Sequence, residues 1–119
     1  MSRPPAAPAS PVPVRRGEVW WVDLDPTRGS EIRKTRPAVV LTADALNRAR
    51  RTVVVVPLST GPTPRPPIVV ATPSAGAGSV AVCDQVRAVD KGRLTRRTGQ
   101  LAPADLRAVE DGVRAVLEL

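Results

Sequence analysis

Polar side chains that can bind an anion or move a proton are most concentrated between Gly29 and Pro37. This stretch holds three cations, one carboxylate and two hydroxyls. They are Ser30, Glu31, Arg33, Lys34, Thr35 and Arg36. Long loops on a rigid scaffold commonly display binding groups, so the stretch is a candidate anion site. The alternative is a solvated loop whose charges do nothing, and the loop taken alone favours that alternative.

Two adjacent hydroxyls, Ser59 and Thr60, follow an apolar run that ends at Leu58. A hydroxyl in this position can donate a hydrogen bond to a negatively charged substrate group. Serine and threonine at the end of a strand also commonly bond the local backbone. The pair therefore becomes a functional candidate only if other polar groups lie near it.

A third polar segment contains Asp84, Gln85 and Arg87. Successive side chains of a strand point to opposite faces, so the three cannot all face one ligand if the segment is a strand. Some of them are then structural. An ion pair between Arg87 and a buried carboxylate is the structural alternative for that residue.

Composition excludes several kinds of site. The chain has no histidine and one cysteine, Cys83, so it has neither an ordinary zinc site nor an intrachain disulfide, and we expect no metal and no cofactor. Lysine and arginine number 18 against 11 acidic residues, a net charge of +7. The excess suits a polyanionic partner, because arginine binds phosphate bidentately, but it equally suits a solubilising surface.

The elements that would position these residues are mainly strands. Valine dominates the apolar residues, and short apolar runs alternate with turn residues, which predicts a small barrel or twisted antiparallel sheet. The predicted strands are 18–24, 38–42, 52–58, 68–72, 79–83 and 86–89. The run 52–58 is almost continuously apolar, as in a strand buried on both faces.

Two helices are predicted besides the strands. Asp44 is the expected N-cap of a short helix reaching Ala49. A C-terminal helix beginning at Ala102–Pro103 has an apolar stripe that we expect to close the sheet or serve a subunit interface. The stripe consists of Leu106, Val109, Val113, Val116 and Leu117.

The beginning of the chain has a different composition. Residues 1–14 are mostly proline, alanine and serine, and we expect a disordered tail before one domain spanning 15–119. No apolar run suits a signal peptide or a membrane span, so a cytoplasmic protein is expected.

The order of several short motifs resembles the MazF/PemK family of toxin endoribonucleases. The motifs are Arg16-Gly17-Glu18-Val-Trp, Asp25-Pro26, Gly29-Ser30-Glu31, Arg36-Pro37-Ala-Val-Val-Leu, Pro57-Leu58-Ser59 and Asp84-Gln85-Val-Arg87-Ala-Val-Asp90-Lys91-x-Arg93-Leu94. Each motif is weak alone, whereas their order and spacing are specific. The resemblance extends from about residue 15 to the C-terminus.

This resemblance implies an SH3-like barrel with a terminal helix, assembled as a homodimer. It also implies a toxin that cleaves single-stranded RNA at short sequence motifs without a metal. Members of the family are neutralised by a cognate antitoxin whose acidic C-terminal segment occupies the RNA groove.

The resemblance also assigns site residues. The key arginine falls on Arg36 and the catalytic hydroxyl on Ser59. Many members have threonine at the Ser59 position, which keeps a hydroxyl, and Thr60 is the alternative source of that hydroxyl. We expect Arg36 to stabilise phosphate charge rather than act as a base, and Glu31 to be the proton acceptor. The expected RNA-binding residues are Ser30, Arg28, Arg33, Lys34, Thr60, Asp84 and Gln85.

Two other functions remain open at this point. A gyrase-inhibiting toxin of the CcdB type has a similar barrel, although its signal, a C-terminal tryptophan, is missing from the terminal residues 116–119. A nucleic-acid-binding SH3-like module without catalysis would bind in a salt-sensitive way and cut nothing.

Overall fold

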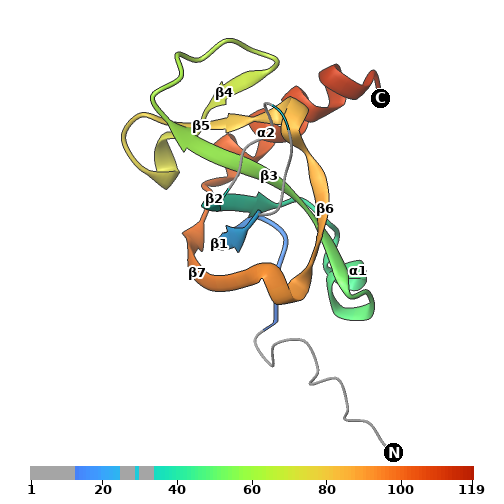
Figure 1. Ribbon diagram of the computed structural model, residues 1–119. Coiled ribbons are helices and arrows are strands. Elements are labelled where there is room, and N and C mark those ends of the chain that lie inside the picture. The colour runs from blue at the N-terminus through green and yellow to red at the C-terminus, as the bar shows by residue number, and fades with distance from the viewer. Residues whose placement is uncertain (1–12, 25–28, 30–33) are drawn as a thin grey trace, which may run out of the picture.

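The computed structural model describes residues 13–24, 29 and 34–119, and it is built mainly of strands (Figure 1). The strands are β1 (Glu18–Asp23), β2 (Thr35–Val40), β3 (Thr52–Thr60), β4 (Val69–Ala71), β5 (Ser79–Val82), β6 (Arg87–Asp90) and β7 (Leu94–Gln100). The helices are α1 (Asp44–Ala49) and α2 (Pro103–Leu117), with short 3-10 helices η1 (Pro73–Ala75), η2 (Cys83–Gln85) and η3 (Lys91–Arg93). The predicted twisted antiparallel sheet with a C-terminal helix is confirmed.

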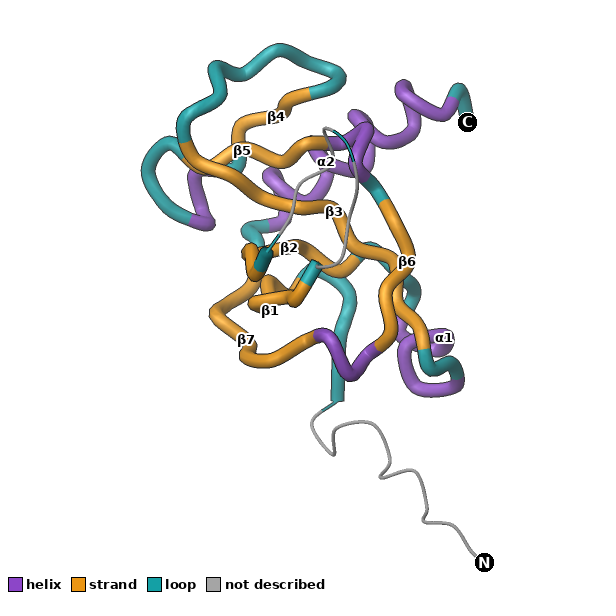
Figure 2. The backbone as a smooth tube through the Cα atoms, viewed as in Figure 1, coloured by secondary structure: helices purple, strands orange, loops and turns teal. Residues whose placement is uncertain are grey.

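Every pair of neighbouring strands is antiparallel, in the order β4-β5-β3-β2-β1-β7, and β6 also pairs with β3. The strand β3 thus pairs with three others and runs through the middle of the fold (Figure 2). This is the strand that the valine run predicted, and it extends two residues further, to Thr60.

Both faces of the central strands are buried, which explains why the apolar runs hardly alternate. Val53 and Val55 belong to one core cluster, whereas Val56 and Leu58 belong to a second, on which α2 packs. In α2 the predicted stripe is confirmed at Val109, which is fully buried. The end of the stripe is different, because Leu117 is half exposed in the last turn of the helix.

The segment before β1 is held to the fold by side-chain and backbone contacts. Val14 is buried in the first core cluster. The Arg16 guanidinium forms a salt bridge to Glu110 of α2, with a distance of 2.6 Å between Nη2 and Oε2. The expected disorder of residues 1–14 is therefore wrong at Val14, and for residues 1–12, which lie outside the described part of the chain, it stays a prediction.

The predicted capping role of Asp44 is wrong. The N-cap of α1 is Ala43, and it makes no side-chain capping bond. The Asp44 carboxylate accepts a hydrogen bond from the backbone N–H of Arg16 at 2.7 Å, and this bond lowers the pKa of Asp44 below its ordinary value. Asp44 therefore ties the chain before β1 to α1.

The strand β7 is missing from the sequence prediction. Its sequence, LTRRTGQ, is polar and mostly exposed, and only Leu94 is fully buried. It pairs along one side of β1, from Glu18 opposite Gln100 to Val22 opposite Leu94. Pairing with β1 rather than burial holds this strand in place.

Candidate functional site

The candidate site lies where β2 and β3 separate. Their ladder contains three pairs and ends with Ala38 opposite Pro57. Beyond that point, residues 58–60 of β3 pair with β5, and residues 35–37 of β2 pair only with β1. The two strands diverge, and neither strand's backbone closes the space between them.

A cavity of about 600 Å³ opens at this divergence. Its lining combines apolar groups with hydroxyls, an amide and a guanidinium, drawn from β1, β2, β3, β5, β7 and η1. The lining residues are Val19, Trp21, Thr35, Arg36, Pro37, Leu58, Ser59, Thr60, Ser74, Ala75, Ser79, Thr98, Gly99 and Gln100. The volume lies within the range of roughly 300–1,000 Å³ that is typical of ligand pockets.

Arg36 and Ser59 line this cavity together. Arg36 is exposed and Ser59 is half buried, so neither is sealed inside the barrel. The Ser59 hydroxyl lies 3.5 Å from the carbonyl oxygen of Thr60, at the limit of a hydrogen bond, and it can turn toward a better acceptor. A cation and a hydroxyl at one opening can bind the same phosphate group.

The other predicted site residues that the structure describes lie at three places in the fold. Thr60 lines the same cavity, at the end of β3. Lys34 is exposed directly before β2, in a left-handed backbone conformation with φ 66°. Asp84 and Gln85 lie in η2, which contributes nothing to the cavity wall.

Asp84 and Gln85 lie in a 3-10 turn between β5 and β6, so the alternation of side chains considered for a strand does not apply to them. Four other predicted residues lie outside the described residues. They are Arg28, Ser30, Glu31 and Arg33.

Sequence reasoning missed two walls of the cavity. One is the end of β7, with Thr98 and Gln100; only the β-branched threonines of this polar stretch indicated a strand. The other is η1, where Ser74 is anchored to α2: the Asp105 carboxylate accepts from the Ser74 N–H at 2.7 Å and from its hydroxyl. The Ser74 hydroxyl oxygen in turn accepts from the N–H of Ala102 at 3.0 Å. These hydrogen bonds attach this wall of the cavity to the beginning of α2.

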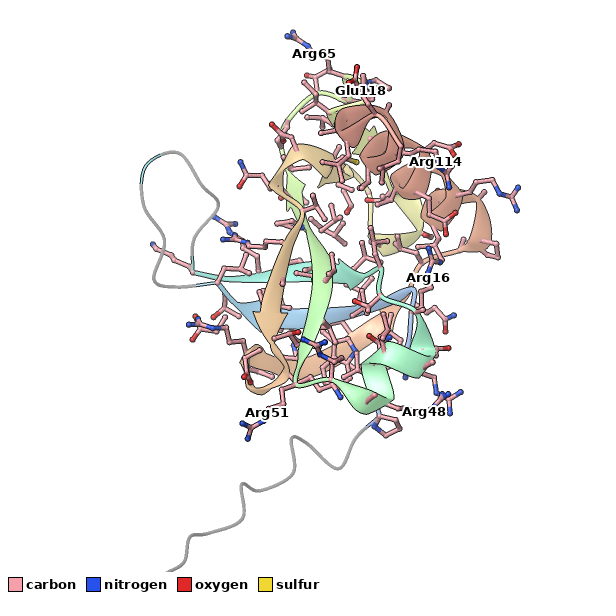
Figure 3. The ribbon with its side chains drawn as sticks, turned by 90° about the vertical axis from the view of Figure 1, so that its right-hand side faces the viewer. Arg16, Arg48, Arg51, Arg65, Arg114 and Glu118 are labelled. Carbon is pink, nitrogen blue, oxygen red and sulfur yellow. The ribbon has the colours of Figure 1, made fainter. Side chains whose placement is uncertain are left out.

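Four exposed arginines of the described part of the chain do not form one patch. Figure 3 shows Arg65 and Arg114 toward one end of the molecule and Arg48 and Arg51 at the opposite end. Arg36 differs from them because it lies at the cavity.

The single cysteine lies away from the cavity. Cys83 is fully buried, and burial raises the pKa of its thiol to about 11. A neutral, buried thiol is a poor nucleophile. In the described ranges, histidine, cysteine, aspartate and glutamate form no group of three that could hold a metal ion.

Comparison with known proteins identifies the family. A family model described as "PemK-like, MazF-like toxin of type II toxin-antitoxin system" matches residues 15–117. The chain belongs to this family. It is 34% identical over 115 residues to endoribonuclease MazF9 of Mycobacterium tuberculosis, an alignment that covers 89% of this chain and 98% of that relative. The resemblance found in the sequence is thus confirmed.

Solved structures of MazF proteins share the fold. MazF from Deinococcus radiodurans superimposes with a TM-score of 0.81 at 23% identity, covering 91% of this chain and 99% of the other. An endoribonuclease in complex with its cognate antitoxin, from a mycobacterial species, gives a TM-score of 0.73 at 22% identity, covering 89% and 96%. In the part of the chain that the structure describes, neither helix is long and apolar enough to cross a membrane.

Proposed function

We propose that this chain is a toxin endoribonuclease that cuts single-stranded RNA at short sequence motifs without a metal ion. The observation that carries the proposal is the cavity shared by Arg36 and Ser59 where β2 and β3 diverge. The family and the endoribonuclease named above, which is 34% identical, support the same activity.

The chemistry follows from the substrate. The ribose 2′-oxygen attacks the adjacent phosphorus, a new O–P bond forms, and the bond from phosphorus to the 5′-oxygen breaks. The products are a 2′,3′-cyclic phosphate and a 5′-hydroxyl, and the proton of the 2′-hydroxyl must reach the departing 5′-oxygen. The enzyme has to guide this proton and stabilise the charge on the phosphorane.

Arg36 supplies charge stabilisation in this proposal. Its guanidinium can hold two non-bridging oxygens at once and stays protonated at neutral pH, which makes it an electrostatic group rather than a base. Ser59 donates a further hydrogen bond to the same phosphate. Glu31 is the proposed proton acceptor.

The remaining predicted residues are proposed to bind RNA outside the cut. Arg28, Arg33 and Lys34 would follow the backbone through charge, and Ser30 and Thr60 would contact groups beside the scissile phosphate. Asp84 and Gln85 would contact base edges at a distance from the cavity, because they lie in η2 rather than on its walls.

Partners and location are proposed with the activity. The chain would act in the cytoplasm as a homodimer whose domain spans 15–119, and a cognate antitoxin with an acidic C-terminal segment would neutralise it. The antitoxin complex of a structurally similar endoribonuclease supports such a partner. The acidic segment would compete with RNA for Arg36, since both are polyanions.

The experiment is cleavage of a long single-stranded RNA by the purified chain in EDTA, with analysis of the product ends. We expect discrete cuts that end in 2′,3′-cyclic phosphate, and their loss in Arg36→Ala. Intact RNA together with inhibited DNA supercoiling would favour the gyrase-directed alternative. Salt-sensitive RNA binding without cuts would favour a binding module.

A further inference from the structure

The cavity extends well beyond Arg36 and Ser59, and most of its lining residues have no role in binding the scissile phosphate. Its apolar surface comes from Val19, Trp21, Pro37 and Leu58. Val19 and Leu58 also belong to the second core cluster, so the cavity is an uncovered extension of that core. A phosphate group gains nothing from such a surface, whereas a flat apolar ligand does.

Trp21 is the aromatic group of the cavity. Its neighbour Trp20 is buried in the first core, and the Trp20 indole N–H donates to Glu18 at 3.0 Å. Successive strand residues face opposite ways, so Trp21 points away from that core, and it is only half buried. Tryptophan has a large aromatic face on which a base can stack.

The strands on either side hold Trp21 in place. Pro37 lies opposite it on β2 and Arg96 lies opposite it on β7. Residues directly opposite in antiparallel strands share a face, so a rigid ring and a cation flank the indole. Arg96 is exposed. A base on Trp21 would lie in the cavity that Arg36 also lines.

Two polar side chains at the cavity wall could not form hydrogen bonds to an apolar protein side chain. Within the described ranges, the side chains of Thr35 and Gln100 make no hydrogen bond to the protein. A nucleobase edge offers donors and acceptors to both, whereas a leucine or phenylalanine side chain offers none. The lining therefore fits a base better than an apolar residue of a protein partner.

We propose that this cavity holds one unstacked nucleobase of the RNA, next to the scissile phosphate, stacked on Trp21 and identified by Gln100. The inference rests on the proposed function and deepens it. Stacking accepts every base, because each has a π-face, so Trp21 contributes affinity. The Gln100 amide carries a donor and an acceptor, so it contributes base identity.

The test uses RNA oligonucleotides that contain a mapped cut site and a 2′-deoxy group at that site, so that they bind without being cut. Each base of the motif is replaced in turn by an abasic residue. Kd is measured for the wild type, Trp21→Ala, Trp21→Phe and a control, Ile68→Ala, which changes an apolar residue 43% exposed outside the cavity lining.

At one position next to the cut, we expect removal of the base to weaken binding to the wild type about 10- to 100-fold. The same removal should hardly change binding to Trp21→Ala, because that variant has already lost the stacking contact. Trp21→Phe keeps an aromatic face and should bind RNA like the wild type, which would also show that the fold tolerates a substitution at position 21. The control Ile68→Ala should likewise bind RNA like the wild type. Equal abasic losses in wild type and Trp21→Ala at every position would overturn the inference, even where cleavage is normal.

A second series separates the two roles. Oligonucleotides with each of the four bases at the coupled position are bound to Trp21→Ala and to Gln100→Ala. Trp21→Ala should weaken the binding of all four oligonucleotides to the same extent. Gln100→Ala should instead reduce the differences in Kd among the four. An unchanged preference in Gln100→Ala would remove that residue from the proposal.

Failure of the proposed function gives a different pattern. If unmodified RNA is not cut, the same variants are compared on homopolymeric RNA oligonucleotides with and without an abasic residue, and coupling to Trp21 there would leave the base site in place and refute the nuclease. A Trp21→Ala variant with unchanged RNA binding but weakened neutralisation by an acidic antitoxin peptide would make the cavity a protein-docking site and overturn the inference.

Discussion

Arg36 on β2 and Ser59 on β3 each lie two residues beyond Ala38 and Pro57, the last pair of the β2–β3 ladder. Continuing the register of that ladder by two residues places Arg36 opposite Ser59. The strands have separated there, so the two residues line a cavity instead of a sheet. A guanidinium and a hydroxyl distant in sequence are thereby brought to one opening.

Replacing Arg36 should affect cleavage far more than stability. Loss of one preorganised charge-stabilising donor typically costs about 100- to 1,000-fold in rate, and we expect a loss of that order for Arg36→Ala. Arg36→Lys keeps the charge without the bidentate fork and should recover only part of the rate. Single-turnover cleavage measures this, with Arg51→Ala, an exposed arginine outside the cavity, as the control.

The two adjacent hydroxyls can be separated by substitution. We expect Ser59→Ala to slow cleavage about 10-fold or more, Ser59→Thr to retain most of the rate, and Thr60→Ala to change it little. The reason is that Ser59 is the residue opposite Arg36 in the continued register. A larger loss in Thr60→Ala than in Ser59→Ala would assign the catalytic hydroxyl to Thr60.

Glu18 should stabilise the N-terminal side of the sheet. Its buried carboxylate accepts from the Trp20 indole N–H at 3.0 Å and the Arg15 N–H at 2.8 Å, and it pairs with the Arg97 guanidinium at 2.8 Å. We expect Glu18→Ala to lower the free energy of unfolding by about 2–4 kcal/mol, because buried donors lose their acceptor. Glu18→Gln keeps an acceptor oxygen and should cost less in urea unfolding.

Gly112 allows α2 to approach the second core. A Cβ atom there would lie 2.7 Å from the Cys83 sulfur and 2.8 Å from the Pro67 carbonyl oxygen. We expect Gly112→Ala to lower the melting temperature, because overpacking costs about 1–3 kcal/mol and the gain in helix propensity is smaller. Arg107→Ala, on the exposed side of α2, is the control and should change little. Unchanged melting in Gly112→Ala would contradict this packing.

The buried thiol predicts a decline in stability at alkaline pH. The pKa of Cys83 is raised from 9.0 to about 11 in the folded chain, so the unfolded chain loses this proton first. The contribution of this thiol to stability is then constant below pH 9 and falls between pH 9 and 11. Urea unfolding across this window should show a steeper decline for wild type than for Cys83→Ala. Parallel curves would contradict the prediction.

The sequence predicted those parts of the fold in which burial follows a simple pattern. The valine run of β3 and the spacing of apolar residues in α2 both reflect contact with a core. The strand β7 was missed because backbone pairing with β1 holds it, and its polar side chains do not reveal that pairing. The Asp44 cap was wrong because Arg16, far along the chain, uses its carboxylate.

The site was predictable only in part, because its lining residues come from strands that are distant in the sequence. Arg36 and Ser59 were found through motifs of a known family, and each motif is local. The contributions of Trp21, Ser74 and Gln100 to one cavity depend on which strands become neighbours. No spacing within the sequence specifies that arrangement.

The divergence of β2 and β3 has a consequence for solubility. Strand ends at the edge of an opening in a sheet invite edge-to-edge association with other chains. Pro37 and Pro57 flank this opening, and proline has no N–H to offer an incoming strand. The opening between β2 and β3 is therefore a poor template for a strand of another chain, which protects the protein against aggregation.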